Sequence, residues 1–219
     1  MNETVRAMSI LDLDAIRASD VKHTPYDYMV GKSAIRAEAI PRLREDFPGI
    51  KATGFHPLEQ MNVKGAFAEL IGEIESPQFT AAVSDTLGVD LRPYPTLITI
   101  RKISAAHEGR IHCDSESKIA TLLIYMNEGW LSPDGRFRVL KNGKNFDDYV
   151  AEVSPEMGSV VAFKRADHSW HGHTPFVGER RVVQIAWVRS QEDIDRKKKR
   201  HGVSSFFKNF FKREKADAY

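Results

Sequence analysis

The run Arg181-Val-Val-Gln-Ile-Ala-Trp-Val188 decides the fold class, together with four shorter runs that precede it. These are Thr96-Leu-Ile-Thr-Ile100, Ile119-Ala-Thr-Leu-Leu-Ile-Tyr125, Phe137-Arg-Val-Leu140 and Gly158-Ser-Val-Val-Ala-Phe163. Each run is rich in β-branched or aromatic residues, and turn-forming residues separate one run from the next. Because no long helical segment lies between them, we expect an antiparallel sandwich or jelly roll.

The N-terminal part of the chain has a different pattern. Helical periodicity appears at residues 33–47, 63–74 and 78–87. We therefore expect one globular domain that is mainly β with α. Its parts would be a helical or mixed support in residues 1–90, the β core in residues 91–190 and a basic tail in residues 191–219.

The composition is that of an ordinary globular protein, with 42% hydrophobic and 28% charged residues in a chain of 219. Cys113 is the single cysteine, so the chain has neither an internal disulfide nor a cysteine-based zinc cluster. The sequence has no classical signal peptide and no apolar run of the roughly 18 residues that span a bilayer. These features predict a cytoplasmic protein.

The first chemical signal is Ile111-His-Cys-Asp114. Residues i and i+2 of a strand point to the same face, about 6.6 Å apart along the backbone, so His112 and Asp114 can converge on one ion. A second signal, Asp167-His-Ser-Trp-His-Gly-His173, can supply another imidazole. Two histidines and one carboxylate on one face of a metal leave its other positions open, as redox iron requires. A lone His-x-Asp pair is more often a hydrogen-bonded turn or a surface pair.

A third signal is Thr174-Pro-Phe-Val-Gly-Glu-Arg-Arg181, which leads into an apolar strand. A guanidinium buried at the start of such a strand needs an anionic partner, and a dicarboxylic cosubstrate would supply one. An internal salt bridge is the structural alternative.

In this order, the signals resemble the prolyl-4-hydroxylase-like branch of the Fe(II)/2-oxoglutarate dioxygenases. The matching positions are His112 and Asp114, Thr121-Leu-Leu-Ile-Tyr-Met-Asn-Glu-Gly-Trp130, His171, Arg181 and Trp187. The resemblance implies a double-stranded β-helix core, bound Fe(II), and 2-oxoglutarate and O₂ as cosubstrates. It also implies hydroxylation of an unactivated C–H bond with release of succinate and CO₂. Ascorbate is a candidate reductant.

The family spacing selects among neighbouring residues. It favours His171 over His168 and His173 as the third metal ligand, and Arg181 over Arg180 as the 2-oxoglutarate ligand. Strand alternation places only one of the two arginines on the face shared by Val183, Ile185 and Trp187. The resemblance further suggests that Tyr125 donates its hydroxyl to 2-oxoglutarate, although a core tyrosine would give the same pattern.

The chain also departs from the family pattern. Arg136 replaces the second glycine of a usual Gly-Gly pair, and Arg101 and Lys102 stand near a position where the family often has tyrosine. The substrate side of the site is therefore expected to differ from that of the prolyl hydroxylases.

The primary substrate is left open between a peptidyl side chain, an amino acid, a lipid and a saccharide. Nucleic acid is disfavoured, because nucleic acid demethylases of this superfamily carry a second arginine where this chain has Trp187. Two other functions compete with the oxygenase: a cupin-type metalloenzyme without 2-oxoglutarate and a catalytically silent binding module. The spacing of Arg181 argues against the first, and the complete ligand set argues against the second.

The positive surplus of the chain, whose net charge is +2, lies in the tail. Phe206, Phe207, Phe210 and Phe211 fall on one face of a helix, with lysines around them. Such a basic amphipathic helix can lie on an anionic membrane surface, here through residues 203–213. The alternative, slightly favoured, is that the phenylalanines pack on the β core or on a second subunit.

Overall fold

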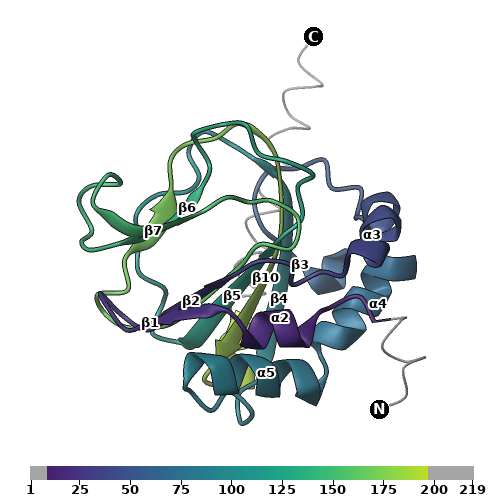
Figure 1. The fold of residues 1–219 in the computed structure, drawn as a ribbon, viewed down its shortest axis with the longest axis horizontal. Helices are drawn as coiled ribbons and strands as arrows, with labels where there is room; N and C mark the ends of the chain where they lie inside the picture. Colours follow the sequence, from purple (N-terminus) through teal and green to yellow (C-terminus); the bar gives the residue numbers. More distant parts are fainter. Residues whose placement is uncertain (1–8, 197–219) are drawn as a thin grey trace.

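The fold consists of two antiparallel β-sheets with helices on one side, as the computed structural model shows for residues 9–196 (Figure 1). The larger sheet has seven strands in the order β1-β2-β8-β5-β10-β4-β3, and the smaller has three in the order β7-β6-β9. The strands of the larger sheet are β1 (Asp20–Lys22), β2 (Tyr28–Gly31), β3 (His56–Pro57), β4 (Thr96–Ser104), β5 (Lys118–Tyr125), β8 (Val160–Lys164) and β10 (Gly178–Val188). Those of the smaller sheet are β6 (Phe137–Leu140), β7 (Tyr149–Val153) and β9 (His171–His173).

One face of the larger sheet is covered by helices. These are α2 (Leu13–Arg17), α3 (Ile40–Asp46), α4 (Gly65–Ile74) and α5 (Pro77–Leu87), with short 3₁₀ turns at Ala37–Ala39 and Leu58–Gln60. Val183, Ile185 and Trp187 of β10 point to this side and join the main apolar core. Trp187 stacks on Phe79 of α5, with ring centroids 6.2 Å apart.

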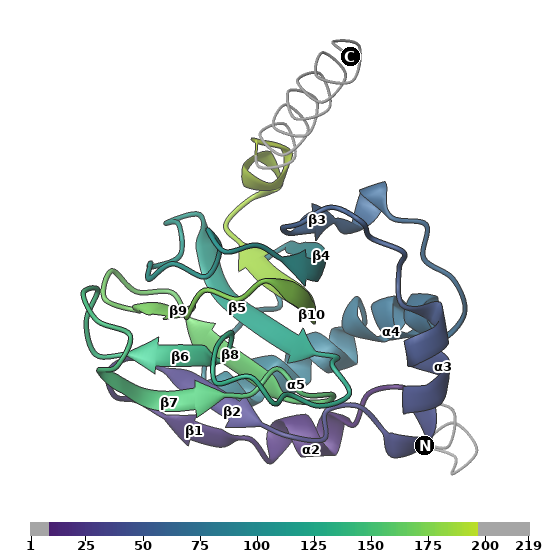
Figure 2. The ribbon, with the colours of Figure 1, turned by 90° about the horizontal axis from the view of Figure 1, so that it is seen from above.

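The opposite face of the larger sheet packs against the smaller sheet. A second apolar cluster joins Tyr125, Phe163 and Val182 of the larger sheet to Phe137 and Val153 of the smaller one. Figure 2 shows β6 and β7 on the side of the large sheet away from α4. Because β5 and β10 are buried on both faces, they read as nearly continuous apolar runs rather than as alternating ones.

All five expected strands are present, some with longer bounds than expected. The structure adds five that the sequence pattern did not single out: β1, β2, β3, β7 and β9. The missed strands are short, with five residues or fewer each. Three of them lie in residues 1–90, so this segment extends the larger sheet as well as supporting it.

The helices expected at residues 63–74 and 78–87 are α4 and α5. Helix α5 has a clear start and stop: the Ser76 hydroxyl accepts the Phe79 N–H at 3.2 Å, Pro77 occupies the first turn, and Gly88 ends the helix with φ of 69°. The helix expected from residue 33 begins only at Ile40. Pro41 lies in the first turn of α3, and a proline has no N–H to continue a helix that starts further upstream.

The predicted amphipathic segment 203–213 lies outside the described residues. No helix among residues 9–196 combines the length and the apolar character needed to cross a membrane.

We expect Trp187→Ala to lower the free energy of unfolding by about 3–5 kcal/mol, because it leaves a cavity between the sheet and α5. Urea denaturation measures this. Val177→Ala is the control, since the Val177 side chain is 71% exposed and its loss should change stability by less than about 0.5 kcal/mol. Equal effects of the two substitutions would contradict the role of Trp187 in joining the layers.

Candidate active site

His112, Asp114 and His171 come together in the space between the two sheets. Their ligand atoms all lie within 4.8 Å of one another, although 57 residues separate the two parts of the sequence that carry them. His112 forms an antiparallel bridge with His171, with both backbone N–H···O bonds at 3.0 Å. This bridge places the His-x-Asp segment directly beside β9, and it brings the three side chains to one point.

Both imidazoles are oriented by their neighbours. The Nδ1 atom of His112 lies 2.8 Å from the carbonyl oxygen of Arg110, and that of His171 lies 2.8 Å from the carbonyl oxygen of Ser169. A carbonyl only accepts hydrogen bonds, so each Nδ1 carries the proton and each Nε2 keeps a free lone pair. Such a partner on the second nitrogen is the usual arrangement of metal-binding histidines.

Asp114 is buried and has two close partners. Lys118 Nζ and Thr121 Oγ1 each lie 2.6 Å from one of its carboxylate oxygens. Burial raises the pKa of Asp114, but the positive charge of Lys118 and the two hydrogen bonds outweigh this and hold the pKa well below its ordinary value. The carboxylate is therefore ionised at neutral pH, as a metal ligand must be.

His171 is buried against Phe163, whose ring centroid is 4.3 Å away. Burial lowers the pKa of His171 to about 4, and the same cause lowers that of His173 to about 3. Both rings are neutral at physiological pH. Two neutral imidazoles and one carboxylate suit a divalent transition metal, so the residues present fit Fe(II).

The three residues line a pocket of about 230 Å³. Its apolar wall contains Phe55, Leu123, Phe137 and Phe163. Its polar groups besides the triad are Arg101, Lys118, Thr121, His173, Arg180 and Gln184. A mostly apolar pocket with a few convergent polar groups is typical of a small-molecule site.

Arg180, rather than Arg181, points into this pocket. Its side chain is fully buried, whereas Arg181 pairs with Glu179 at 2.5 Å and lies over the Phe47 ring. The expectation that Arg181 faces the site is therefore corrected. Alternation did place Arg181 with Val183 on one face, but that is the face covered by helices. Arg180 shares the other face with Val182 and Gln184, and the pocket lies on that face.

The segment after β5 fixes the position of Arg180. The Asn127 side chain accepts the Arg181 N–H at 2.9 Å and donates to the carbonyl of Pro155 at 2.5 Å, which fixes the start of β10. The Gly135 carbonyl then accepts Arg180 Nε at 2.7 Å. Gly135 has φ of 76°, and a Cβ there would come within 2.8 Å of Trp130, so this position requires glycine.

Tyr125 is buried beside this arginine, and its hydroxyl oxygen lies 3.2 Å from Arg180 Nη2. The structure thus places the sequence-predicted tyrosine next to the guanidinium that enters the pocket. Of the other two histidines that competed with His171, His168 is exposed and outside the pocket, while His173 lines the pocket without joining the triad.

The sequence interpretation gave no role to Lys118, Thr121 or Gln184. Thr121 and Gln184 were detectable in principle. Thr121 shares one face of β5 with Tyr125, and Gln184 shares one face of β10 with Arg180, because an even number of residues separates each pair. Lys118 had no such signal, because only the fold brings it to Asp114.

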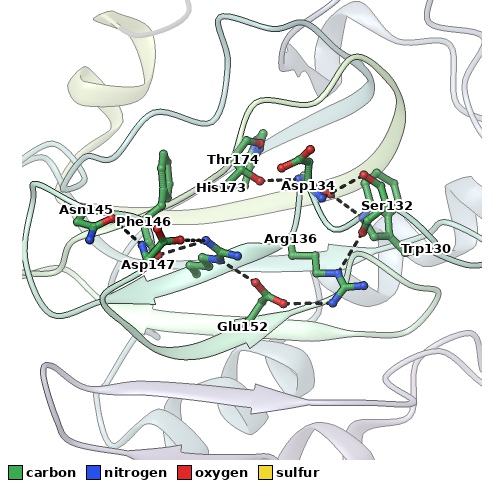
Figure 3. A network of polar contacts seen from close by, with 12 residues as sticks. Trp130, Ser132, Asp134, Arg136, Asn145, Phe146, Asp147, Glu152, His173 and Thr174 are labelled. Atoms are coloured by element: carbon green, nitrogen blue, oxygen red, sulfur yellow. Dashed lines mark hydrogen bonds and ion pairs between the residues drawn. The ribbon is translucent and has the colours of Figure 1, made fainter.

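A polar network joins β6 and β7 of the smaller sheet to the loop after Trp130 (Figure 3). Glu152 of β7 accepts hydrogen bonds from Arg136 at 3.2 Å and from Arg138 at 2.7 Å. Arg136 also binds the carbonyl of Ser132 at 3.2 Å. The second-glycine position of the family pattern thus holds an arginine that ties the loop after Trp130 to β7, away from the pocket.

Residues 99–189 match the family described as the 2OG-Fe(II) oxygenase superfamily. This segment contains the triad, Tyr125 and both arginines, and it begins in β4 and ends just after β10. The match covers 91 of the 219 residues. The match supports an Fe(II)- and 2-oxoglutarate-dependent dioxygenase, with O₂ as the other cosubstrate.

Solved structures of prolyl 4-hydroxylases share the fold. The enzyme from Pseudomonas putida has a TM-score of 0.54 at 18% identity, over 81% of this chain and 93% of that one. The one from Phytophthora capsici has 0.52 at 18% identity, over 85% and 70%. A prolyl hydroxylase from Trichoplax adhaerens, solved with a hypoxia-inducible-factor peptide, has 0.51 at 11% identity, over 80% and 88%. Among curated proteins, none matches the sequence.

We expect the metal-free protein to lose stability as the pH falls from about 6.5 towards 4. The folded-state pKa values of His171 and His173 lie below the ordinary value of about 6.5, so the unfolded chain binds more protons in this window. Each histidine contributes at most about 1.4 kcal/mol per pH unit. Urea denaturation in EDTA at several pH values tests this, and His173→Asn should reduce the slope. An unchanged slope in that variant would show that His173 titrates normally in the folded protein.

Proposed function

We propose that His112, Asp114 and His171 bind the Fe(II), and that Arg180 with Tyr125 binds the distal carboxylate of 2-oxoglutarate. One observation carries the second assignment. Arg180 is a fully buried cation in the pocket that holds the triad, and no carboxylate of residues 9–196 forms an ion pair with it. An unpaired buried charge is costly, and a dicarboxylate bound in the pocket would supply the missing partner.

The protein's own groups prepare this site. The carbonyl oxygens of Arg110 and Ser169 hold the two imidazoles in the tautomer that presents Nε2. Thr121 and Lys118 hold the Asp114 carboxylate in place. When bound, the iron and 2-oxoglutarate supply the oxidising power, through reduction of O₂ coupled to decarboxylation of the cosubstrate.

The guanidinium of Arg180 is arranged for a carboxylate. Its Nε donates to the Gly135 carbonyl and its Nη2 to the Tyr125 hydroxyl oxygen, so the remaining N–H groups are free to form a paired contact. Because the Tyr125 oxygen accepts this bond, its own proton is available for the same anion. Phe137 and Phe163 give the pocket an apolar wall beside the triad.

We further propose a double-stranded β-helix as the description of the two sheets, and hydroxylation of a peptidyl C–H bond as the reaction. The neighbour from Trichoplax adhaerens binds a peptide, which favours the peptidyl class over a lipid or a saccharide.

Substitution of the two neighbouring arginines tests the cosubstrate assignment. Arg180→Met should weaken 2-oxoglutarate binding at least about tenfold, because a buried charged pair is worth roughly 2–5 kcal/mol. Arg181→Met is the matched control and should leave affinity within about twofold, since its side chain lies on the other face. Anaerobic titration of the Fe(II) protein, followed by the visible charge-transfer band of the chelate, measures both. The reverse ranking would return the role to Arg181.

The metal assignment is tested in the same titration. His171→Ala should abolish the band, because it removes one of three ligands, while His168→Ala should retain it. If the iron-loaded wild type shows no band, 2-oxoglutarate does not chelate the metal, and a cupin-type metalloenzyme becomes the better hypothesis.

A further inference from the structure

Arg101 is a second buried guanidinium in the pocket, and its hydrogen bonds are incomplete. Its side chain is 8% exposed. Its Nη1 lies 3.5 Å from His173 Nε2 and its Nη2 lies 3.4 Å from Glu108 Oε1, both long for hydrogen bonds of a charged donor. Its Nε has no partner within the described part of the chain. A guanidinium carries five N–H donors, so most of its capacity is unused.

The surroundings hold this side chain in place. Arg101 pairs with Val182 across β4 and β10, and its guanidinium lies 4.1 Å from the centre of the Phe55 ring. His173 Nδ1 lies 2.8 Å from the carbonyl oxygen of Thr174 and donates to it, which leaves Nε2 as the acceptor that faces Arg101. The Glu108 carboxylate is shared, because its other oxygen accepts the Ala105 N–H at 2.8 Å. The guanidinium is thus oriented without being neutralised by a tight ion pair.

The charges of the pocket favour an anionic ligand beyond 2-oxoglutarate. Arg101, Lys118 and Arg180 are cationic, and Asp114 and Glu108 are their acidic neighbours. The three cationic and two acidic side chains together leave the empty pocket with one excess positive charge. Fe(II) and the 2-oxoglutarate dianion cancel each other, so the loaded pocket still carries that excess. Burial lowers the pKa of Arg101 to about 10, so the side chain remains charged at neutral pH.

We propose that Arg101 determines substrate specificity by binding a carboxylate of the primary substrate. The inference rests on the proposed function, in which the iron takes the 2-oxo acid end of 2-oxoglutarate and Arg180 with Tyr125 takes the other. Both ends of the cosubstrate then have partners, and Arg101 is left for the substrate. The substrate class is a molecule, such as a peptide with an acidic side chain, that carries a carboxylate in addition to the oxidised carbon.

Acetate is a suitable probe, because it is the smallest stable carboxylate with an observable methyl group. The enzyme is loaded with Mn(II), which does not turn over, and with saturating 2-oxoglutarate. Paramagnetic relaxation of the acetate methyl protons is then titrated, with acetamide as the neutral control. We expect saturable binding of acetate and not of acetamide, and at least about fivefold weaker binding in Arg101→Gln. Arg101→Lys should restore part of the affinity, since it keeps the charge.

Lys102→Gln is the matched control. It removes a cation from the next residue, whose ammonium lies 3.7 Å from Glu179 and outside the pocket lining, and acetate affinity should not change. No saturable acetate binding in the wild type, or equal binding in Arg101→Gln, would overturn the proposal. So would a loss of 2-oxoglutarate affinity in Arg101→Gln as large as in Arg180→Met, because Arg101 would then bind the cosubstrate. If the proposed function itself is wrong, the result is different: 2-oxoglutarate affinity is then the same in Arg180→Met as in the wild type.

Discussion

Burial of the Arg180 guanidinium is the constraint on which the site depends. A cation placed between two sheets must be hydrogen-bonded and must have an anion within reach. The Gly135 carbonyl and the Tyr125 hydroxyl provide the hydrogen bonds. The loop from Trp130 to Gly135 is held in turn by a hydrogen bond from Trp130 Nε1 to the Asp134 carbonyl at 2.8 Å and by the packing of Trp130 on Phe176. The apolar and polar parts of this loop thus hold the Arg180 charge at a defined position in the pocket.

The same pocket separates two kinds of charged group. Asp114 has two close donors that keep it ionised and fixed before any metal arrives. Arg180 has a close hydrogen bond, at 2.7 Å, only to the neutral Gly135 carbonyl, and Arg101 has only long contacts, at 3.4 and 3.5 Å. The pocket thus has a fixed carboxylate on one side, which suits a cation, and two guanidinium groups with unused N–H donors on the other, which suit anions. Arg101, a departure from the family pattern, lies among these donors in the pocket.

Strand periodicity was sufficient for the core of the fold. The runs around Ile98, Leu122 and Ile185 are apolar over several residues, so they were identifiable as buried strands. Strands β7 and β9 were missed, because β9 has three residues and only one of the five residues of β7 is buried. Their pairing with β6 depends on contacts between distant parts of the chain, which a local pattern does not contain.

The sequence by itself determined the candidate ligand types and their spacing: His112, Asp114 and His171 with an arginine about ten residues later. It also determined, by alternation, that Arg180 and Arg181 point to opposite faces of one strand. Only the tertiary structure decided which face is the pocket, because both faces of β10 are buried, one under helices and one under the smaller sheet. Period-two alternation separates two faces, but it does not say what covers each of them, and packing between distant segments supplies that information.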